Sequence, residues 1–284
     1  MSRAFAGENA ETWSGKDRAD ENFPVGSILI RRDLRRHVHA FYAFARNADD
    51  IADHPHLPPE EKIQRLDIME AVLTGTRESG SPTATALRAS LVATKVTATH
   101  ARELLIAFRQ DATKKRYASW TELMEYCRYS AAPVGRYVLE LHGEKHVTWR
   151  ASDALCASLQ VLNHLQDCAN DLRTLDRCYL PQDWLSEAKS STEEVAAART
   201  SPRLRQVFAM ILRENNKLNA IAADLPKLVD NRRLRIETAV ITALARRLQA
   251  RLNHNDPLAM RVKLRAIDVA SAILSALPRL AGHT

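Results

Sequence analysis

Two short acidic segments constrain the fold of this chain more than any other feature of its sequence. The first reads RNADDIAD over residues 46–53, and the second reads NHLQDCAND over residues 163–171. Each contains two aspartates four residues apart. The pairs are Asp49 with Asp53 and Asp167 with Asp171. On an α-helix this spacing places both carboxylates on one face, roughly 6 Å apart, where their repulsion destabilises the helix unless a cation lies on them. The pattern therefore predicts two helices with cation-binding faces.

Apolar residues precede each acidic segment, which argues against helices that only face solvent. The stretch HAFYAF over residues 39–44 leads into the first segment, and residues 159–165 lead into the second. Asn163 lies one turn before Asp167 and adds a third oxygen to that face. We expect the two acidic faces to oppose each other across an interior and to bind hard divalent cations through oxygen ligands. A diphosphate bridged between metal ions suits this arrangement.

The composition favours helices and an anionic partner. The chain has only 8 Gly among 284 residues, which is unfavourable for a turn-rich β fold. Its net charge of +7 and pI of about 9.4 indicate phosphate groups, an acidic membrane surface or nucleic acid as the partner. Nucleic acid is the weakest of the three, because no basic stretch is interleaved with aromatic residues for base stacking.

The sequence predicts a cytoplasmic protein. Its N-terminus has no apolar leader, no run of about 18 apolar residues is present, and its four cysteines form no paired motif. Peripheral attachment to the inner face of the membrane is a further option, and the apolar segment 267–280 reads as a core helix or a surface-docking helix.

Hydrophobic periodicity predicts an all-α protein with no convincing strand. We expect a flexible segment over residues 1–20 and a single all-α domain over residues 21–284. The expected helices cover residues 32–53, 60–73, 84–110 (in one piece or two), 121–141, 153–172, 202–225, 232–252 and 257–277. Proline within the segment AAPVG (131–135) interrupts the fourth of these helices, and its small neighbours let a ligand or another helix come close.

Several residues near the acidic segments have a functional and a structural interpretation. Arg46 either forms an ion pair within its helix or binds phosphate, which a guanidinium matches well. Arg177 and Tyr179, just after the second segment, can close over the same anion. Phe23, Phe41, Tyr42 and Tyr126 read as core aromatics, and in a pocket that ionises a diphosphate they also shield a carbocation. The histidines His142, His146 and His164 show no ligand spacing and are expected to be structural.

Taken together, these motifs resemble the squalene/phytoene synthase family. The resemblance rests on FPV (23–25), YAFARNADDIAD (42–53), YCRYSAAPVG (126–135), LQVLNHLQDCAND (159–171) and RCYLP (177–181). It covers residues 20–265 in order and implies an isoprenoid synthase fold, a helical bundle around a central cavity with Mg²⁺ bound by the two acidic segments.

The resemblance also implies roles for individual residues. The metal ligands would be Asp49, Asp50, Asp53, Asn163, Asp167 and Asp171. The substrate-binding residues would be Phe23, Arg46, Ala131, Val134, Gly135, Arg177, Tyr179 and Arg261. Tyr42 and Tyr126 would lie beside the reacting carbons, and Gln160 would line the cavity. For the catalytic group that delivers water, the candidates are Gln160 and Gln166.

Two departures from the family pattern narrow the expected reaction. Gln166 stands where many members carry a basic residue, and Glu21-Asn22 stands where they carry Ser-Lys. The loss of a cation suits an enzyme that receives one diphosphate rather than two. The opening ENFPV (21–25), together with Gln166 before the second motif, resembles the hydroxysqualene synthase branch of hopanoid biosynthesis. That branch takes presqualene diphosphate, adds water and needs Mg²⁺ but no NADPH.

Three alternatives stay open at this stage. One is a squalene or phytoene synthase that condenses two prenyl diphosphates head to head. Another is a non-catalytic partner that binds prenyl diphosphates for neighbouring pathway enzymes. The third, suggested by charge alone, is a nucleic-acid-binding protein. For the enzyme, brief contact with a membrane surface is expected because its product is very apolar.

Overall fold

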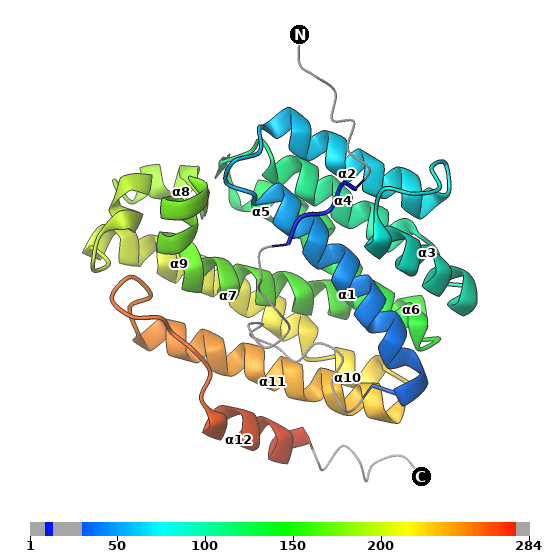
Figure 1. The fold of residues 1–284 in the computed structure, drawn as a ribbon. Helices are drawn as coiled ribbons and strands as arrows, with labels where there is room; N and C mark the ends of the chain where they lie inside the picture. Colours follow the sequence, from blue (N-terminus) through cyan, green and yellow to red (C-terminus); the bar gives the residue numbers. More distant parts are fainter. Residues whose placement is uncertain (1–8, 14–29, 277–284) are drawn as a thin grey trace. The chain divides into compact units, whose positions relative to one another are not determined.

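The computed structural model of the chain describes residues 9–13 and 30–276 (Figure 1). Within these residues α-helices dominate, which confirms the all-α prediction. Internal packing distinguishes two compact units. Unit 1 comprises residues 1–114 and 136–143, and unit 2 comprises residues 115–135 and 144–284.

Unit 1 contains the first acidic segment, at the end of its longest helix. Its helices are α1 (Arg32–Ala52), α2 (Pro59–Thr74), α3 (Pro82–Thr94), α4 (Thr99–Asp111) and the later part of α6 (Ala132–Leu141). Figure 1 shows α1 running past α2, α3 and α4, and α1 packs against all three. Fully buried side chains of α1, Phe44 and Ile51 among them, join Leu66 and Leu104 in the core. This packing leaves the opposite side of α1 partly open.

The segment 9–13 is docked on unit 1 by hydrogen bonds. The Ala10 backbone N–H donates to the Gly80 carbonyl at 2.8 Å, and Arg65 donates to the Ala10 carbonyl at 3.1 Å. The Asn47 side chain on α1 donates to the Thr12 carbonyl. Asn47 is completely buried, so this contact satisfies one of its amide hydrogens and ties the segment to the helix that carries Asp49.

Unit 2 contains the second acidic segment, on its longest helix. Its elements are β1 (Arg116–Tyr117), α5 (Trp120–Ser130), the start of α6, a 3₁₀ turn (His146–Thr148), α7 (Trp149–Leu175), β2 (Cys178–Pro181), α8 (Gln182–Glu187), a 3₁₀ turn (Thr192–Ala196), α9 (Pro202–Ala222), α10 (Leu225–Leu228), α11 (Arg232–His254) and α12 (Ala266–Ala276). The helices α7, α9 and α11 pack against one another and form the centre of the unit (Figure 1).

A buried polar network joins these three helices. Gln249 of α11 accepts hydrogen bonds from Asn215 at 2.7 Å and Asn219 at 2.6 Å, and its own amide donates to the Leu212 carbonyl at 3.0 Å. Ser158 of α7 donates to Asn219 at 2.9 Å. Buried polar groups contribute to specificity when they are mutually hydrogen-bonded, so this network fixes the register of α7, α9 and α11.

The structure differs from the sequence-based expectations at three places. The prediction of no strand was wrong, because β1 and β2 form a short parallel pair. The last helix begins at Ala266 instead of residue 257, since contacts with the rest of unit 2 hold the preceding segment in a non-helical conformation. The Asp256 carboxylate accepts hydrogen bonds from Thr200 and from the Leu258 N–H. The short helix α8 follows Pro181, where no helix was expected.

Candidate active site

The first acidic face lies at the C-terminal end of α1, in unit 1. Tyr42, Arg46, Asp49 and Asp53 follow one another at intervals of three or four residues, and all four are partly exposed. The other side of the helix is buried, with Ala48, Ile51 and Ala52 inaccessible to solvent. Asp53 is the residue that ends the helix, and its N–H still donates to the Asp49 carbonyl. The predicted common face of Asp49 and Asp53 is therefore present within unit 1.

Arg46 is held between the two neighbouring aspartates. Its guanidinium lies 3.2 Å from the Asp49 carboxylate and 3.0 Å from that of Asp50. The Asp50 side chain is only 3% exposed, whereas that of Asp49 is 36% exposed. Asp50 thus orients Arg46 from inside the protein, and Asp49 lies at the edge of the buried region with part of its side chain accessible.

Negative charge accumulates around Asp49. The surrounding protein excludes water from the Asp49 carboxyl, and this burial raises its pKa well above the usual range. The charge of Asp53 raises this pKa further, as do those of Asp111 and Asp50, against the opposing effect of Arg46. A bound cation would remove this repulsion, so the donor set of this face fits a hard divalent ion.

The second acidic face lies on α7, in unit 2. Asn163, Asp167 and Asp171 are each partly exposed at intervals of four residues, and Gln160 continues the same side of the helix. Between them Leu162, Leu165 and Cys168 are buried. The oxygen-bearing side chains therefore share one partly open face of α7, as their spacing predicts.

Each acidic face contributes two aspartates as possible ligands for a metal ion. Within residues 9–13 and 30–276, no group of three His, Cys, Asp or Glu side chains is placed to hold a metal ion. Mg²⁺ commonly takes only one or two carboxylates and fills its other positions with phosphate oxygens and water. Asp49 with Asp53 and, separately, Asp167 with Asp171 match that mode of binding.

The loop before α12 brings Arg261 to the second acidic face. Arg261 lies 3.7 Å from the Asp167 carboxylate, and both side chains are substantially exposed. Gln166 is buried and donates a hydrogen bond to the Val262 carbonyl. Gln166 thus fixes the position of the loop that carries Arg261.

Aromatic rings gather beside α7 in unit 2. The Tyr179 ring lies 5.3 Å from that of Tyr117 and 5.6 Å from that of Tyr126, measured between centroids. The His164 ring stacks on Tyr179 at 3.4 Å. Arg177 is only 3% exposed and donates to the Tyr179 hydroxyl at 3.1 Å. We call Tyr117, Tyr126, His164 and Tyr179 the ring cluster.

Sequence reasoning missed two members of the ring cluster. Tyr117 was not singled out, and His164 was assigned a structural role because a lone histidine has no ligand spacing. One signal was available, since His164 follows Gln160 by one helical turn, and the Gln160 amide lies 3.2 Å from His164 Nε2. Burial lowers the pKa of His164 to about 3, and the positive charge of Arg177 contributes. The imidazole is therefore neutral near pH 7.

In the segment 131–135, Gly135 lies where two helices of unit 2 pack closely. Ala131 is buried, and Val134 is 42% exposed. A Cβ atom at Gly135 would lie 2.7 Å from the Cys156 sulfur and closer still to the Ser152 hydroxyl, both on α7. Of the two options left open by the sequence, close approach of another helix is the one observed at Gly135. The expected substrate-binding residue Phe23 lies outside the described residues.

Among the residues described, no helix has the length and apolar character needed to cross a lipid bilayer.

Solved structures identify the class of fold. A dehydrosqualene synthase determined in complex with a ligand superposes with a TM-score of 0.76 over 93% of each chain, at 19% sequence identity. The squalene synthase HpnC from Alicyclobacillus acidocaldarius gives a TM-score of 0.72 at 31% identity, over 82% of this chain and 88% of that one. The helical arrangement is the isoprenoid synthase fold.

Sequence comparisons then identify the family. The family model described as squalene/phytoene synthase matches residues 16–268. A hydroxysqualene synthase from Rhodopseudomonas palustris is 44% identical over 94% of this chain and 91% of its own length. One from Sinorhizobium fredii is 45% identical over 88% of this chain and 85% of its own length. The chain belongs to the squalene/phytoene synthase family, which confirms the resemblance seen in its motifs.

Proposed function

We propose that this protein converts presqualene diphosphate to hydroxysqualene, with loss of diphosphate and addition of water. The proposal draws on the similarity to hydroxysqualene synthases over most of the chain. The observation that carries it is the combination on α7 of an oxygen-lined face with the buried ring cluster. The oxygen-lined face would bind the diphosphate through metal ions, and the ring cluster would stabilise the carbocation left when that diphosphate departs.

Each acidic face binds the leaving group in the same manner. Asp49 and Asp53 on α1, and Asn163, Asp167 and Asp171 on α7, would hold Mg²⁺, which when bound neutralises charge on the diphosphate. Arg46, Arg177 and Arg261 supply guanidinium groups for its oxygens, with Asp50 fixing the orientation of Arg46.

The ring cluster stabilises the cation by its π faces and keeps bulk water away from it. The C–O bond to diphosphate breaks with both electrons going to oxygen, and the cyclopropylcarbinyl cation rearranges. One water oxygen then donates an electron pair to the cation, and one proton is released. Tyr42 lies on the acidic face of α1 and adds a further aromatic side chain there.

The pair Gln160 and His164 is our candidate for holding that water. Both side chains carry hydrogen-bonding nitrogen or oxygen beside otherwise aromatic walls. Gln166, the other candidate from the sequence, donates its amide to the Val262 carbonyl, which suits a positioning role for the Arg261 loop. The enzyme works in the cytoplasm in this proposal, and its apolar product passes to a membrane.

One incubation separates this reaction from its rivals. Purified protein is mixed with Mg²⁺ and either presqualene diphosphate or farnesyl diphosphate, with and without NADPH, in ¹⁸O-labelled water. We expect presqualene diphosphate to give labelled hydroxysqualene without NADPH. Turnover of farnesyl diphosphate alone would favour a complete head-to-head synthase. Absence of turnover with tight binding of presqualene diphosphate would favour the non-catalytic binding partner.

A further inference from the structure

The helix α12 is turned with its charge inward and its apolar side chains outward. Asp268, the only charged residue in α12, accepts hydrogen bonds from Arg251 of α11 at 2.8 Å and from the Arg265 N–H at 2.7 Å. Its side chain is 15% exposed. Ala272 and Ala276 are fully buried where α12 packs on α11. Only small and ionic groups therefore anchor this helix to unit 2.

The outward side of α12 carries most of its large side chains. Ile267 is 73% exposed, Leu274 65%, Ile273 45% and Val269 39%. Ile267 and Leu274 lie in one row and Val269 and Ile273 in a second row roughly 130° around the helix, with the exposed Ala270 between them. Together they form one broad outward face, which we call the apolar stripe. An exposed stripe of this kind marks a surface that binds a membrane or another protein.

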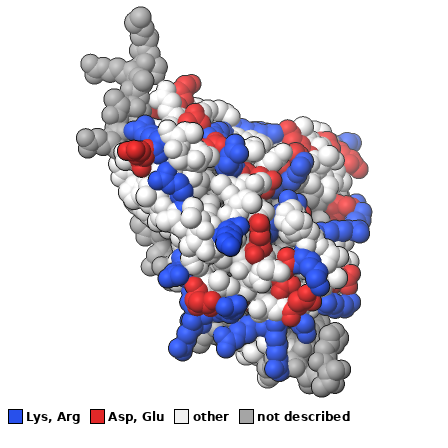
Figure 2. Space-filling model, turned by 90° about the vertical axis from the view of Figure 1, so that its right-hand side faces the viewer, with Lys and Arg blue, Asp and Glu red and all other residues white. Residues whose placement is uncertain are grey.

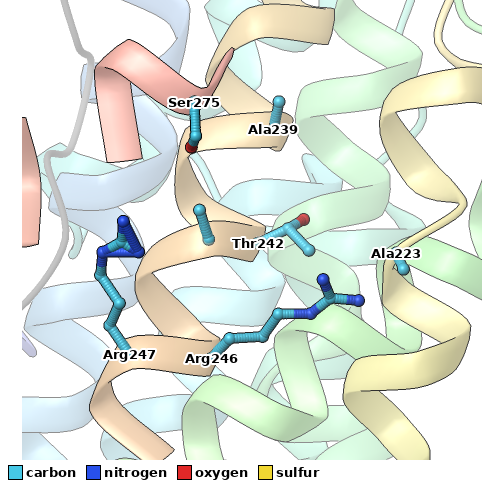
Figure 3. A pocket seen from close by; sticks show the side chains of 7 residues that line it. Ala223, Ala239, Thr242, Arg246, Arg247 and Ser275 are labelled. Carbon is cyan, nitrogen blue, oxygen red and sulfur yellow. The ribbon is translucent and has the colours of Figure 1, made fainter. Parts of the chain in front are cut away.

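A pocket of about 270 Å³ lies along α11, and α12 contributes one side chain to it. Thr242, Arg246 and Arg247 of α11, Ser275 of α12 and three alanines line it (Figure 3). Figure 3 shows Arg246 reaching across the pocket toward Ala223, whereas Arg247 points toward α12, where it donates to the Ser271 hydroxyl. Among the described residues Arg246 has no acidic partner, so its guanidinium is available to an anion.

Cations also surround the start of α12. Lys263 and Arg265 are exposed in the segment just before it. Figure 2 shows Lys and Arg side chains gathered at the lower end of the face that it draws. An apolar stripe bordered by cations is complementary to a bilayer that contains anionic lipids.

We propose that this region docks on an anionic phospholipid membrane. The apolar side chains of α12 enter the boundary between headgroups and acyl chains, and the pocket at Arg246 and Arg247 binds a lipid phosphate. We call Arg246, Arg247, Lys263, Arg265 and the apolar stripe of α12 the docking surface. The proposal does not depend on the proposed reaction, and its test measures no turnover.

Vesicle flotation of the full chain tests the proposal. Vesicles of phosphatidylcholine alone are compared with vesicles that also contain about one-third phosphatidylglycerol, at low and high salt. We expect binding to the anionic vesicles only, and weaker binding at high salt. Ile273→Ser with Leu274→Ser should reduce the partition coefficient roughly tenfold or more, and Arg246→Gln should reduce it about fivefold.

Matched controls come from exposed residues elsewhere in the chain. Val92→Ser removes an apolar side chain that is 76% exposed on α3, and Arg150→Gln removes an exposed cation at the start of α7. Both controls should bind vesicles like the unaltered protein. Circular dichroism of every variant confirms that the helical content is retained.

Three outcomes would overturn the proposal. Equal binding to neutral and anionic vesicles would remove the role of the cations, and undiminished binding of the double serine variant would remove the role of α12. In analytical ultracentrifugation, a dimer of the unaltered protein that the double serine variant dissociates would assign the apolar stripe to a second copy of the chain.

Discussion

The imidazole of His164 stacks on the phenol ring of Tyr179, with centroids 3.4 Å apart and planes inclined by 15°. His164 is the one member of the ring cluster whose ring contains nitrogen, and Gln160 lies within hydrogen-bonding distance of it. The arrangement combines an aromatic surface that a carbocation tolerates with a polar group that can hold one water molecule.

Replacing His164 by Phe tests this combination. The variant keeps an aromatic ring on Tyr179 and removes the hydrogen-bonding nitrogen. We expect it to remain folded and to release diphosphate, while hydroxysqualene formed per diphosphate falls about tenfold or more because the water is no longer held in place. Mass spectrometry of the products beside a diphosphate assay measures this ratio. An unchanged ratio would exclude His164 from the water site.

The lowered pKa of His164 predicts how the stability of the protein depends on pH. Burial lowers the pKa of His164 from 6.5 to about 3, so the unfolded chain binds a proton more readily than the folded one between these values. The contribution of His164 to the free energy of unfolding is complete above pH 6.5. It declines as the pH falls toward 3, by at most about 1.4 kcal/mol per pH unit. Urea unfolding across this range should show a shallower decline for His164→Phe. Parallel curves of unfolding free energy against pH for the two proteins would contradict the lowered pKa of His164.

Asp49 and Asp50 should respond differently to replacement by Asn. Asp49→Asn removes a proposed metal-binding oxygen and should lower turnover by roughly 10²–10³, with the Mg²⁺ requirement raised. Asp50→Asn weakens the support of Arg46 and should act mainly on substrate binding, since Asp50 is buried against Arg46. Titrations of Mg²⁺ and substrate separate the two effects.

Asp33→Asn is the control for these variants. Asp33 lies in the first turn of the same helix, with its side chain 57% exposed. It should leave the Mg²⁺ requirement unchanged. An Asp49→Asn variant that retained full turnover would disprove the role of the acidic face on α1.

The acidic faces were predictable because residues close together in the sequence define them. A helix repeats every 3.6 residues, so the spacing of Asp49 with Asp53, or of Asn163 with Asp167, fixes a common face without knowledge of the rest of the chain. The order of the helices followed from the same periodicity.

The ring cluster and the strand pair were not predictable in this way. Tyr117 and Tyr179 meet because β1 pairs with β2, and a strand of two residues has no side-chain alternation to detect. His164 acquires its environment from residues far away in the sequence. The start of α12 was also set by distant contacts, since Gln166 holds the preceding loop through the Val262 carbonyl.

Gly135 should be the least replaceable residue of the segment 131–135. In Gly135→Ala the new methyl group would lie 2.7 Å from the Cys156 sulfur and also overlap the Ser152 hydroxyl, so α6 or α7 must shift. Such overpacking costs roughly 1–3 kcal/mol of the free energy of unfolding. Adding Ser152→Ala removes the hydroxyl and leaves Ser152 Cβ, at 3.7 Å, in ordinary contact. The double variant should therefore recover part of the loss, and Cys156→Ala in addition should recover more. Urea unfolding of the series measures these steps, and equal losses in the single and double variants would show that steric overlap with α7 is not the cause.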